Sequence, residues 1–370
     1  MNNNPKNNFS ENSDENLIDY LKELQKESWY DLTSTFREPL SSILPLKRNI
    51  ESELIFDDIE IEAHYDRFSS WEGTISKKSI RDWLEQFETI FDKNIAHLLL
   101  KKFQFVSKSD IEIASRALQN KLLDLLIEEE SLIEIFNSVS NPSKKSDDNF
   151  RKWLQNKVIR YARFPSPSNT SVESQDRLWG IYERSALTGT SSPDGKKLRP
   201  LKEYFEAESS NPENSVFVFM DYTNGSGNQL SKCVIEINKL LAKYPVYTNS
   251  IFVFMYIVQS EFFLLDNMEF AAPNSQTIFY NNMLYYKSSE IINLLANYQI
   301  NEEEYGAFIE KYCLRSSGKT EAGYEQSGSL TCHHYSCPNN TLTFFHKPYE
   351  NWTPLFRNSQ TPSATNYKRK

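Results

Sequence analysis

The chain has 370 residues, more than one hydrophobic core usually supports, so its length predicts two domains. A hydrophobic fraction of 39% is enough for a folded core, and the net charge of −9 excludes a protein that condenses on nucleic acid over its whole surface. No apolar run reaches about 18 residues and the first residues lack a signal-peptide pattern, so we expect a cytoplasmic protein with no membrane partner.

The two ends of the chain are polar. Residues 1–15 are rich in Asn, and residues 358–370 form a polar tail with a small basic tip. Such segments bury too little apolar surface to offset the entropy that is lost on ordering. We therefore expect a disordered N-terminus, a helical pattern that begins at Leu17, and an unstructured tail.

Residues 76–136 have the clearest helical pattern, because apolar residues recur there at spacings of three and four. Ser107, followed three residues later by Asp110, predicts the start of a helix within this block. Three short helices fit a winged helix-turn-helix module, and a plain helical bundle fits the same pattern. Before the block, Ile59 and Ile61 alternate with acidic residues, which predicts a short strand or an extended connection.

A linker rich in Ser, Asp and Pro follows at residues 137–150 and has no periodicity. We place a domain boundary near residues 142–150. Residues 16–142 are then expected to form a mainly helical, winged-helix-like domain, and residues 143–357 a second domain.

The pattern changes after residue 214. Residues 215–221 (SVFVFMD) and 250–258 (SIFVFMYIV) are continuous apolar runs typical of buried strands, and residues 228–244 between them have helical spacing. This order is a βαβ unit, and two fully apolar strands predict a parallel sheet that is covered on both faces. We expect a Rossmann-like α/β fold for the second domain.

The turn of this unit is rich in Gly and polar residues. Gly225 and Gly227 let the backbone approach an anion closely at the start of a helix, where backbone N–H groups and the helix dipole favour negative charge. Further hydrogen-bond donors come from the side chains of Ser226, Asn228 and Gln229. The sequence matches neither a Walker P-loop nor the dinucleotide fingerprint, so we interpret the turn as a phosphate cradle in which Asp221 accepts hydrogen bonds from sugar hydroxyls.

An apolar strand, an acid and a Gly-rich loop together resemble the phosphoribosyl-diphosphate motif of type I phosphoribosyltransferases. In that family two consecutive acids hold the ribose hydroxyls; Asp221 matches the first, and Tyr222 stands in the place of the second. The resemblance implies a nucleotide or phosphoribosyl diphosphate as ligand, with Mg²⁺ bridging the substrate oxygens. It also implies that the missing acid removes one acceptor for a ribose hydroxyl.

The C-terminal segment 323–356 is similar to a divergent branch of this superfamily, found as effectors in bacterial conflict systems. The matching residues are Gly323, Tyr324, Ser327, Pro338, Asn339, Asn340, Thr341, Leu342 and Trp352. In that branch a winged helix-turn-helix is often fused N-terminally, and the resemblance covers about residues 65–356. Such fusions also resemble antiphage effectors of certain retrons. That likeness implies as partners a reverse transcriptase and its RNA-linked DNA, and it implies toxic chemistry in the C-terminal domain.

Other residues near the C-terminus could carry chemistry. Four potential zinc ligands lie too close together in sequence to surround one ion: Cys332, His333, His334 and Cys337. Cys313 and His346 could complete a site with one or two of them, but we favour His333 or His334 pointing toward the nucleotide, as a proton donor to a leaving base or as a phosphate ligand. Arg315 and Lys319 could bind diphosphate or belong to a solvated loop. No motif predicts a metal held directly by the protein.

Three functions therefore stay open. The chain could be a defence effector that acts on a ribose-phosphate or nucleotide, with Asp221 orienting the ribose. It could instead be a nucleotide sensor or nucleic-acid-binding regulator with a decayed site, in which Tyr222 marks the loss of catalysis. Finally, it could be a structural scaffold in a reverse transcriptase complex, which would bind no nucleotide.

Overall fold

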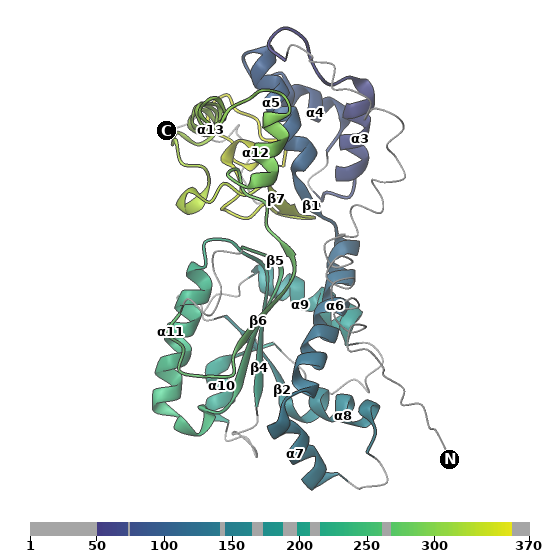
Figure 1. The fold of residues 1–370 in the computed structure, drawn as a ribbon, viewed down its shortest axis with the longest axis vertical. Coiled ribbons are helices and arrows are strands. Elements are labelled where there is room, and N and C mark those ends of the chain that lie inside the picture. The colour runs from purple at the N-terminus through teal and green to yellow at the C-terminus, as the bar shows by residue number, and fades with distance from the viewer. Residues whose placement is uncertain are drawn as a thin grey trace, which may run out of the picture. The chain divides into compact units, whose positions relative to one another are not determined.

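A parallel five-stranded sheet forms the centre of the α/β part of the computed structural model (Figure 1). The strand order is β3 (Arg199–Pro200), β2 (Ile159–Arg163), β4 (Val216–Asn224), β5 (Ile251–Gln259) and β6 (Gln276–Asn282). Every neighbouring pair in this order is parallel. The predicted α/β class and the βαβ unit are therefore confirmed.

The structure describes residues 50–72, 75–140, 145–164, 173–187, 198–207, 215–260 and 268–356. The predicted disordered N-terminus, the helix expected from Leu17 and the polar tail lie outside these residues. All of the described residues belong to one unit, Ile50–Lys370.

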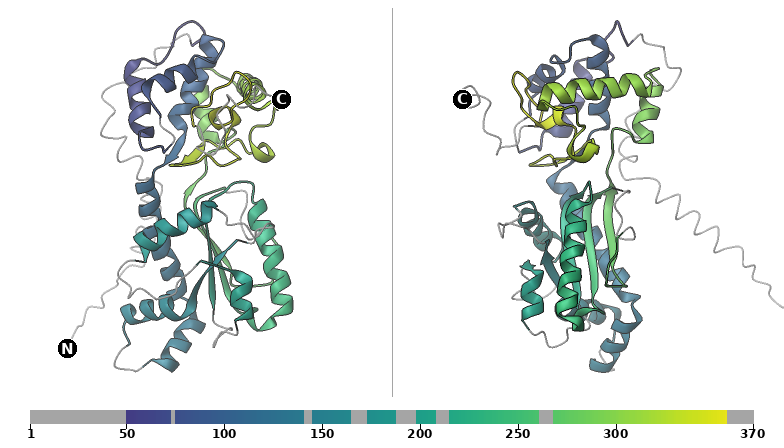
Figure 2. Two further views of the ribbon diagram at one scale, coloured as in Figure 1. Left: turned by 180° about the vertical axis from the view of Figure 1, so that it is seen from behind. Right: turned by 90° about the vertical axis from the view of Figure 1, so that its left-hand side faces the viewer.

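Helices cover both faces of the sheet, as Figures 1 and 2 show. Alternate residues of β4 belong to different cores, because successive side chains of a strand point to opposite faces. One core includes side chains of α6 (Lys108–Ile127), α7 (Glu130–Val139), α8 (Asp147–Trp153) and α9 (Glu173–Ala186). The other includes α10 (Leu201–Glu206) and α11 (Asn228–Lys243). A π-helical turn, Leu154–Val158, precedes β2, and a 3-10 turn, Pro245–Tyr247, precedes β5.

A third core joins helices from the two ends of the described chain. It contains side chains of α3 (Asp58–Phe68), α4 (Lys77–Leu84), α5 (Ile90–Lys102), α12 (Ser289–Ala296), α13 (Glu302–Ser317) and α14 (Thr343–His346). Two short strands, β1 (Gln104–Val106) and β7 (Thr331–His333), pair in parallel, and a 3-10 turn spans Tyr324–Gln326. Residues far apart in sequence therefore complete one core.

The packing changes at a different place from the predicted domain boundary near residues 142–150. Phe105 belongs to the third core, whereas Val106 and the apolar residues of α6 belong to the core on the sheet. The helical block at 76–136 is thus divided between two cores, and the C-terminal segment shares a core with α3, α4 and α5. Periodicity predicted these helices but not their partners, because it reports which face is apolar and not what covers that face.

The winged helix-turn-helix is not confirmed, because α6 packs on the sheet and not in one core with α4 and α5. The strand or extended connection expected around Ile59 and Ile61 is wrong, since both residues lie in α3. Asp57 caps this helix by accepting hydrogen bonds from two backbone N–H groups, and a cap of this kind favours a helix. The start predicted at Ser107 and Asp110 is confirmed as a capping box on α6.

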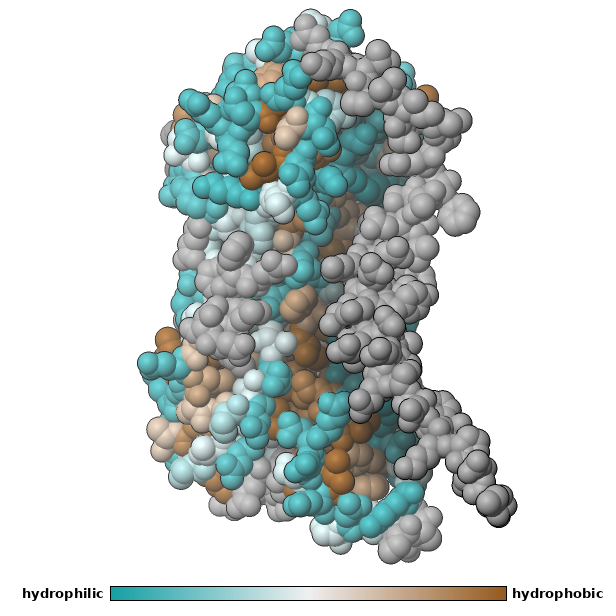
Figure 3. Space-filling model, viewed as in Figure 1, coloured by the Kyte–Doolittle hydropathy of each residue, from teal (hydrophilic) through white to brown (hydrophobic). Residues whose placement is uncertain are grey.

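Apolar side chains reach the surface beside polar ones on the face drawn in Figure 3, including the area near β6 and α6. β6 is one of the two edge strands of the sheet, and its side chains are half-buried or exposed. Among the helices of the described ranges, none combines the length and the apolar character needed to cross a bilayer.

Candidate functional site

The Gly-rich turn lies at the carboxyl end of the central strand β4. The strand is longer than predicted and ends at Asn224, so Asp221 lies within it and not at its end. Gly227 adopts a φ of 76°, in the left-handed region that favours glycine, and is the N-cap of α11. It has no side chain to cap the helix, in contrast with the capping boxes of α4, α6 and α13. The Asn228 N–H meets Ser226 Oγ at 3.5 Å, which is long for a hydrogen bond, so Ser226 is only a weak cap for the first turn of α11.

Asp221 is a buried carboxylate, with 6% of its surface exposed. The backbone N–H of Tyr222 donates to its Oδ1 at 2.7 Å. Burial raises the pKa of Asp221 to about 6, although hydrogen bonds from the Tyr222 backbone and the Gln229 side chain act in the opposite direction. The carboxylate is therefore mainly charged at pH 7 and is held in an environment that disfavours its charge.

Tyr222 lies on the opposite face of β4 from Asp221. Its ring stacks on the ring of His333 with the centroids 4.4 Å apart, and Tyr335 meets both rings. The Arg177 guanidinium lies over the Tyr335 ring, 4.5 Å from its centroid. The residue that replaces the second acid is thus a buried member of an aromatic cluster.

The two predicted catalytic histidines are buried beside this cluster. Burial, helped by His334 and Arg177, lowers the pKa of His333 to about 3. Burial also lowers the pKa of His334, although Glu72 lies 3.5 Å from its Nε2. Both rings are therefore neutral at pH 7, and neither carries the extra proton that a general acid donates. Since His333 stacks on Tyr222, the structure does not bring it together with Asp221 on one face of the strand.

The C-terminal segment packs directly against the Gly-rich turn. A Cβ on Gly225 would collide with the side-chain amide of Asn340, whose Nδ2 donates to the sulfur of Met283 at 3.2 Å. The Nδ2 of Asn228 donates to the Tyr324 hydroxyl at 3.0 Å. Gly225 is therefore required for a close approach of Asn340. The sequence pattern singled out both residues but gave no sign that they touch.

Sequence reasoning missed one polar residue at this end of the sheet. Gln259 is fully buried at the end of β5, and neither its Oε1 nor its Nε2 has a hydrogen-bond partner among the residues that the structure describes. In the sheet register it lies between Asn224 and Asn282, so three amide residues align across the carboxyl ends of adjacent strands. The only signal in the sequence is that Gln259 directly follows the apolar run at residues 250–258.

The two predicted diphosphate ligands lie in different cavities. Arg315 forms an ion pair with Glu88 at 2.9 Å and lines a cavity of about 380 Å³ with Trp352. Lys319 lines a second cavity, of about 440 Å³, which also includes Tyr324. Since Tyr324 contacts Asn228 of the turn, Lys319 belongs to a cavity that adjoins the turn. Arg315 is not among the residues that line it.

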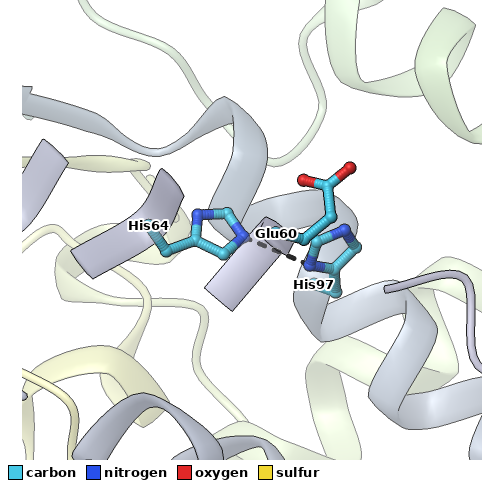
Figure 4. Close-up of side chains that lie close together, drawn as sticks. All are labelled: Glu60, His64 and His97. Carbon is cyan, nitrogen blue, oxygen red and sulfur yellow. Dashed lines mark hydrogen bonds between the residues drawn. The ribbon is translucent and has the colours of Figure 1, made fainter. Parts of the chain in front are cut away.

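None of the residues weighed for zinc belongs to a group of three potential ligands in the part of the chain that the structure describes. The group found there is Glu60, His64 and His97 (Figure 4), whose ligand atoms lie within 4.8 Å of one another. Burial lowers the pKa of His64 to about 2 and of His97 to about 3, so both rings are neutral at pH 7.

Hydrogen bonding at this group argues against a metal. Arg67 can only donate, so its contact of 3.4 Å with Nδ1 of His64 makes Nδ1 the acceptor and leaves the proton on Nε2. That Nε2–H then donates to Nδ1 of His97 at 3.2 Å, as the dashed line in Figure 4 marks. A metal would require the lone pair that this proton occupies. Glu60 is already paired with Lys101 at 3.1 Å, and we interpret the group as a buried hydrogen-bond chain.

The turn offers little to hold Mg²⁺ directly. Mg²⁺ in phosphate-binding sites usually takes one or two carboxylates together with substrate phosphates and water. Asp221 is the one carboxylate of β4 and of the turn, and it is buried and already accepts a hydrogen bond from Tyr222. These residues therefore do not fit a Mg²⁺ ion held by protein ligands alone.

Comparison with known proteins agrees with this arrangement of strand, turn and helix. A search of the curated proteins found no match, and a search of the solved structures found none either. The sequence model of the PRTase-CE family, a phosphoribosyltransferase-like domain, matches residues 80–358. This match spans β4, the Gly-rich turn, α11 and the C-terminal segment that packs on the turn. Because it also covers more than half of the chain, the chain belongs to the PRTase-CE family.

Proposed function

We propose that the turn between β4 and α11 binds the phosphate of a ribose-phosphate or nucleotide. The observation that carries this proposal is the geometry of the turn in a phosphoribosyltransferase-like domain: Gly227, in the left-handed region, begins a helix beyond the carboxyl end of a parallel strand. Ligands of open α/β sheets bind at this edge, where backbone N–H groups meet an anion. Ser226, Asn228 and Gln229 supply further donors.

Asp221 orients the ribose in this proposal. A buried carboxylate is costly for the fold, and such groups are concentrated at functional sites. The raised pKa of Asp221 supports this role. A charged carboxylate in an environment that disfavours its charge does not stabilise the fold, so we expect it to serve a function instead. Mg²⁺ would be carried by the diphosphate of the substrate, since β4 and the turn supply one buried carboxylate. Phosphoribosyl diphosphate is the simplest ligand with all of these groups.

We further propose that the protein is a cytoplasmic antiphage effector, and specifically a retron accessory protein. The support is the similarity of segment 323–356 to effectors of bacterial conflict systems, together with the match to the PRTase-CE family. Its partners would be the reverse transcriptase and the RNA-linked DNA of the retron, which restrain the effector until infection. The toxic step would be ribosyl transfer from the bound ligand or its hydrolysis.

A nucleotide sensor without turnover is the second candidate, and the Tyr222 cluster favours it. The position of the second ribose-binding acid is filled by a ring that stacks on His333. Asn340 lies against Gly225 at the turn that would receive the phosphate, and both nearby histidines are neutral at pH 7. A sensor would bind the ligand and leave it unchanged.

The first experiment measures the thermal stability of the purified chain with phosphoribosyl diphosphate, with and without Mg²⁺, followed by product analysis. We expect the ligand to raise the midpoint of unfolding in the wild-type chain, by preferential binding to the folded state. Asp221→Ala should lose the shift, whereas Asp124→Ala, which removes an exposed acid paired with Arg151, should keep it. New product supports an enzyme, and a shift without product supports a sensor. No shift in the wild-type chain contradicts both.

Expression in cells tests the proposed role as an effector. Wild-type protein without its reverse transcriptase should arrest growth, and Asp221→Ala at equal abundance should not. Arrest by both forms contradicts ribosyl chemistry as the toxic step. Copurification of the chain with the reverse transcriptase from the intact operon tests the partner, and its absence contradicts the retron assignment.

A further inference from the structure

Cys332 and Cys337 flank a tight β-turn at the end of β7. His333 and Ser336 exchange two backbone hydrogen bonds, His333 N–H to Ser336 O at 3.1 Å and Ser336 N–H to His333 O at 3.0 Å. This exchange defines a hydrogen-bonded antiparallel pair. Cys332 and Cys337 are the next residues outward from this bridge, where an antiparallel ladder has a non-hydrogen-bonded pair with Cα atoms typically about 4.5 Å apart. Disulfides span Cα separations of roughly 4.4 to 6.8 Å, so the backbone is suited to a bridge.

The two thiols also pack in the same core. Cys332 is a fully buried member of the core that contains α3, α4 and α5, and Cys337 packs against that core while half-buried. Both side chains therefore lie on the side of the hairpin that faces this core. Burial raises the pKa of the Cys332 thiol above its usual range, so Cys337 is the sulfur that first meets an oxidant from solvent.

The other two cysteines lie on helices, and both are buried. Cys233 is buried in the core on the α11 face of the sheet, and Cys313 is buried in α13, in the same core as Cys332. Burial raises the pKa of both thiols above the usual range, and neither lies on the hairpin that carries Cys332 and Cys337. They provide internal controls for any oxidation at the hairpin.

We propose that Cys332 and Cys337 form a reversible oxidation site, in which a hydroperoxide converts the two thiols into a disulfide within the hairpin. The half-buried Cys337 sulfur attacks the peroxide, the O–O bond breaks, and a sulfenic acid forms with release of an alcohol or water. The Cys332 sulfur, which packs in the same core, then attacks the Cys337 sulfur; the S–S bond forms, the S–O bond breaks, and hydroxide leaves with the thiol proton as water. Two thiols lose two electrons in total, and one hydroperoxide is reduced.

The position of the hairpin gives this reaction a structural consequence. The turn between the two cysteines carries His333 and Tyr335, whose rings meet Tyr222. Its backbone is also joined to the rest of the protein, because His334 N–H donates to Val106 O at 2.9 Å and His334 O accepts from Glu72 N–H at 2.8 Å. A bridge across the base of the turn would restrict the motion of His333 and Tyr335 in the folded chain. It would also limit the conformations that the unfolded chain can adopt.

The test uses the full-length chain, exposed to a small excess of hydrogen peroxide, then alkylated with N-ethylmaleimide under denaturing conditions. Of the four cysteines, Cys332 and Cys337 should escape alkylation, while Cys233 and Cys313 should be labelled. Digestion should give one peptide with an internal bridge, lighter by two hydrogen atoms, and dithiothreitol should restore both thiols. The oxidised chain should also unfold at a higher temperature than the reduced chain.

The matched variant is Cys337→Ser, which keeps the size of this half-buried side chain. It should show no bridge and no change in unfolding temperature after peroxide treatment. Three results would overturn the proposal: Cys337 oxidised to a sulfinic acid without a bridge, bridges that involve Cys233 or Cys313 as readily, or no loss of any thiol. The readout is chemical and does not depend on ligand binding, so it can fail or succeed separately from the proposed function.

Discussion

The side chains on the two faces of β4 have different environments, although their residues alternate along one strand. Asp221 faces α11 and keeps a charge whose environment raises its pKa to about 6. Tyr222, the next residue, faces α6 and α9 and completes a cluster of rings with His333 and Tyr335. One face therefore retains a group that is unfavourable for folding, while the other has been filled with favourable contacts. Under the proposed function, the first acid of the motif serves a ligand, whereas the second position serves packing.

The largest effect should come from Tyr222→Ala, which breaks the packing face. The side chain is 2% exposed and stacks on His333, so its removal leaves a cavity. Truncation of large buried aromatic side chains typically costs about 3 to 5 kcal/mol of the free energy of unfolding. Urea denaturation measures the loss, and Tyr222→Phe, which keeps the ring, should lose far less. A loss below about 1 kcal/mol in Tyr222→Ala would show that the cluster does not support the fold.

Asp221→Asn removes the charge on the other face and should stabilise the protein. In the unfolded chain this acid ionises near pH 3.8, whereas in the folded chain its pKa is about 6. The folded state therefore binds more protons than the unfolded state between these two values, so the penalty is absent below about pH 4, grows up to pH 6 and is complete above it. A pKa difference of this size corresponds to about 3 kcal/mol.

Urea denaturation of Asp221→Asn at pH 8 and at pH 4 measures this difference. We expect the free energy of unfolding of the variant to exceed that of the wild-type chain by about 2 to 3 kcal/mol at pH 8 and to equal it near pH 4. The same variant should lose the thermal shift with phosphoribosyl diphosphate. Equal stability at both pH values would mean that the buried carboxylate carries no penalty, and the contrast between the two faces would disappear.

Gly225→Ala tests the point where the C-terminal segment meets the turn. The added methyl group collides with Asn340, and overpacking of this kind typically costs about 1 to 3 kcal/mol. The control is Gly306→Ala, because Gly306 lies in α13 with nothing near the added methyl group, and alanine should stabilise a helix by about 0.5 to 1 kcal/mol. Adding Asn340→Ala to Gly225→Ala should restore most of the loss. Failure of this rescue would place the strain elsewhere.

The smallest effect concerns the titration of His333. It is measured as the slope of the free energy of unfolding against pH. The pKa of His333 is lowered to about 3, so below about pH 6.5 the unfolded chain binds a proton that the folded chain does not. The free energy of unfolding therefore falls by up to about 1.4 kcal/mol per pH unit for this group as the pH drops from about 6 to 4. His333→Phe keeps a ring on Tyr222 and should reduce the measured slope by that amount. Tyr222→Phe removes no group that titrates in this range and should leave the slope unchanged.

The sequence predicted the elements whose signals are local. The apolar runs of β4 and β5, the helical spacing of α11 and the capping pair Ser107 and Asp110 each depend on neighbouring residues, and each is confirmed. α3 was missed because Ile59 and Ile61 suggested alternation, although Ile61, His64 and Phe68 have helical spacing and Asp57 stands at the cap. That short segment fits both the two-residue period of a strand and the 3.6-residue period of a helix. The helix cap at Asp57 was the more reliable signal.

The candidate site was predictable only in part, because its remaining members are brought together by tertiary contacts. The Gly-rich turn is visible in the sequence, and so is the replacement of the second acid of the motif by Tyr222. The contact of Asn340 with Gly225, the stack of His333 on Tyr222 and the burial of Gln259 depend on how distant segments pack. Those contacts also decide which face each polar side chain meets, and so they set the protonation states of the histidines.

The parallel pairing of β1 with β7 has a consequence for synthesis on the ribosome. Gln104 pairs with Thr331, so these two strands join parts of the chain that are translated far apart in time. Trp83 donates from its indole N–H to the carbonyl of Phe344, and Phe356 packs on Phe68 in the same core. The apolar faces of α3, α4 and α5 are therefore fully covered only when the C-terminal segment is present. We expect this core to be completed only after the C-terminal segment has been synthesised, and slow release of that segment would leave those faces open to chaperones.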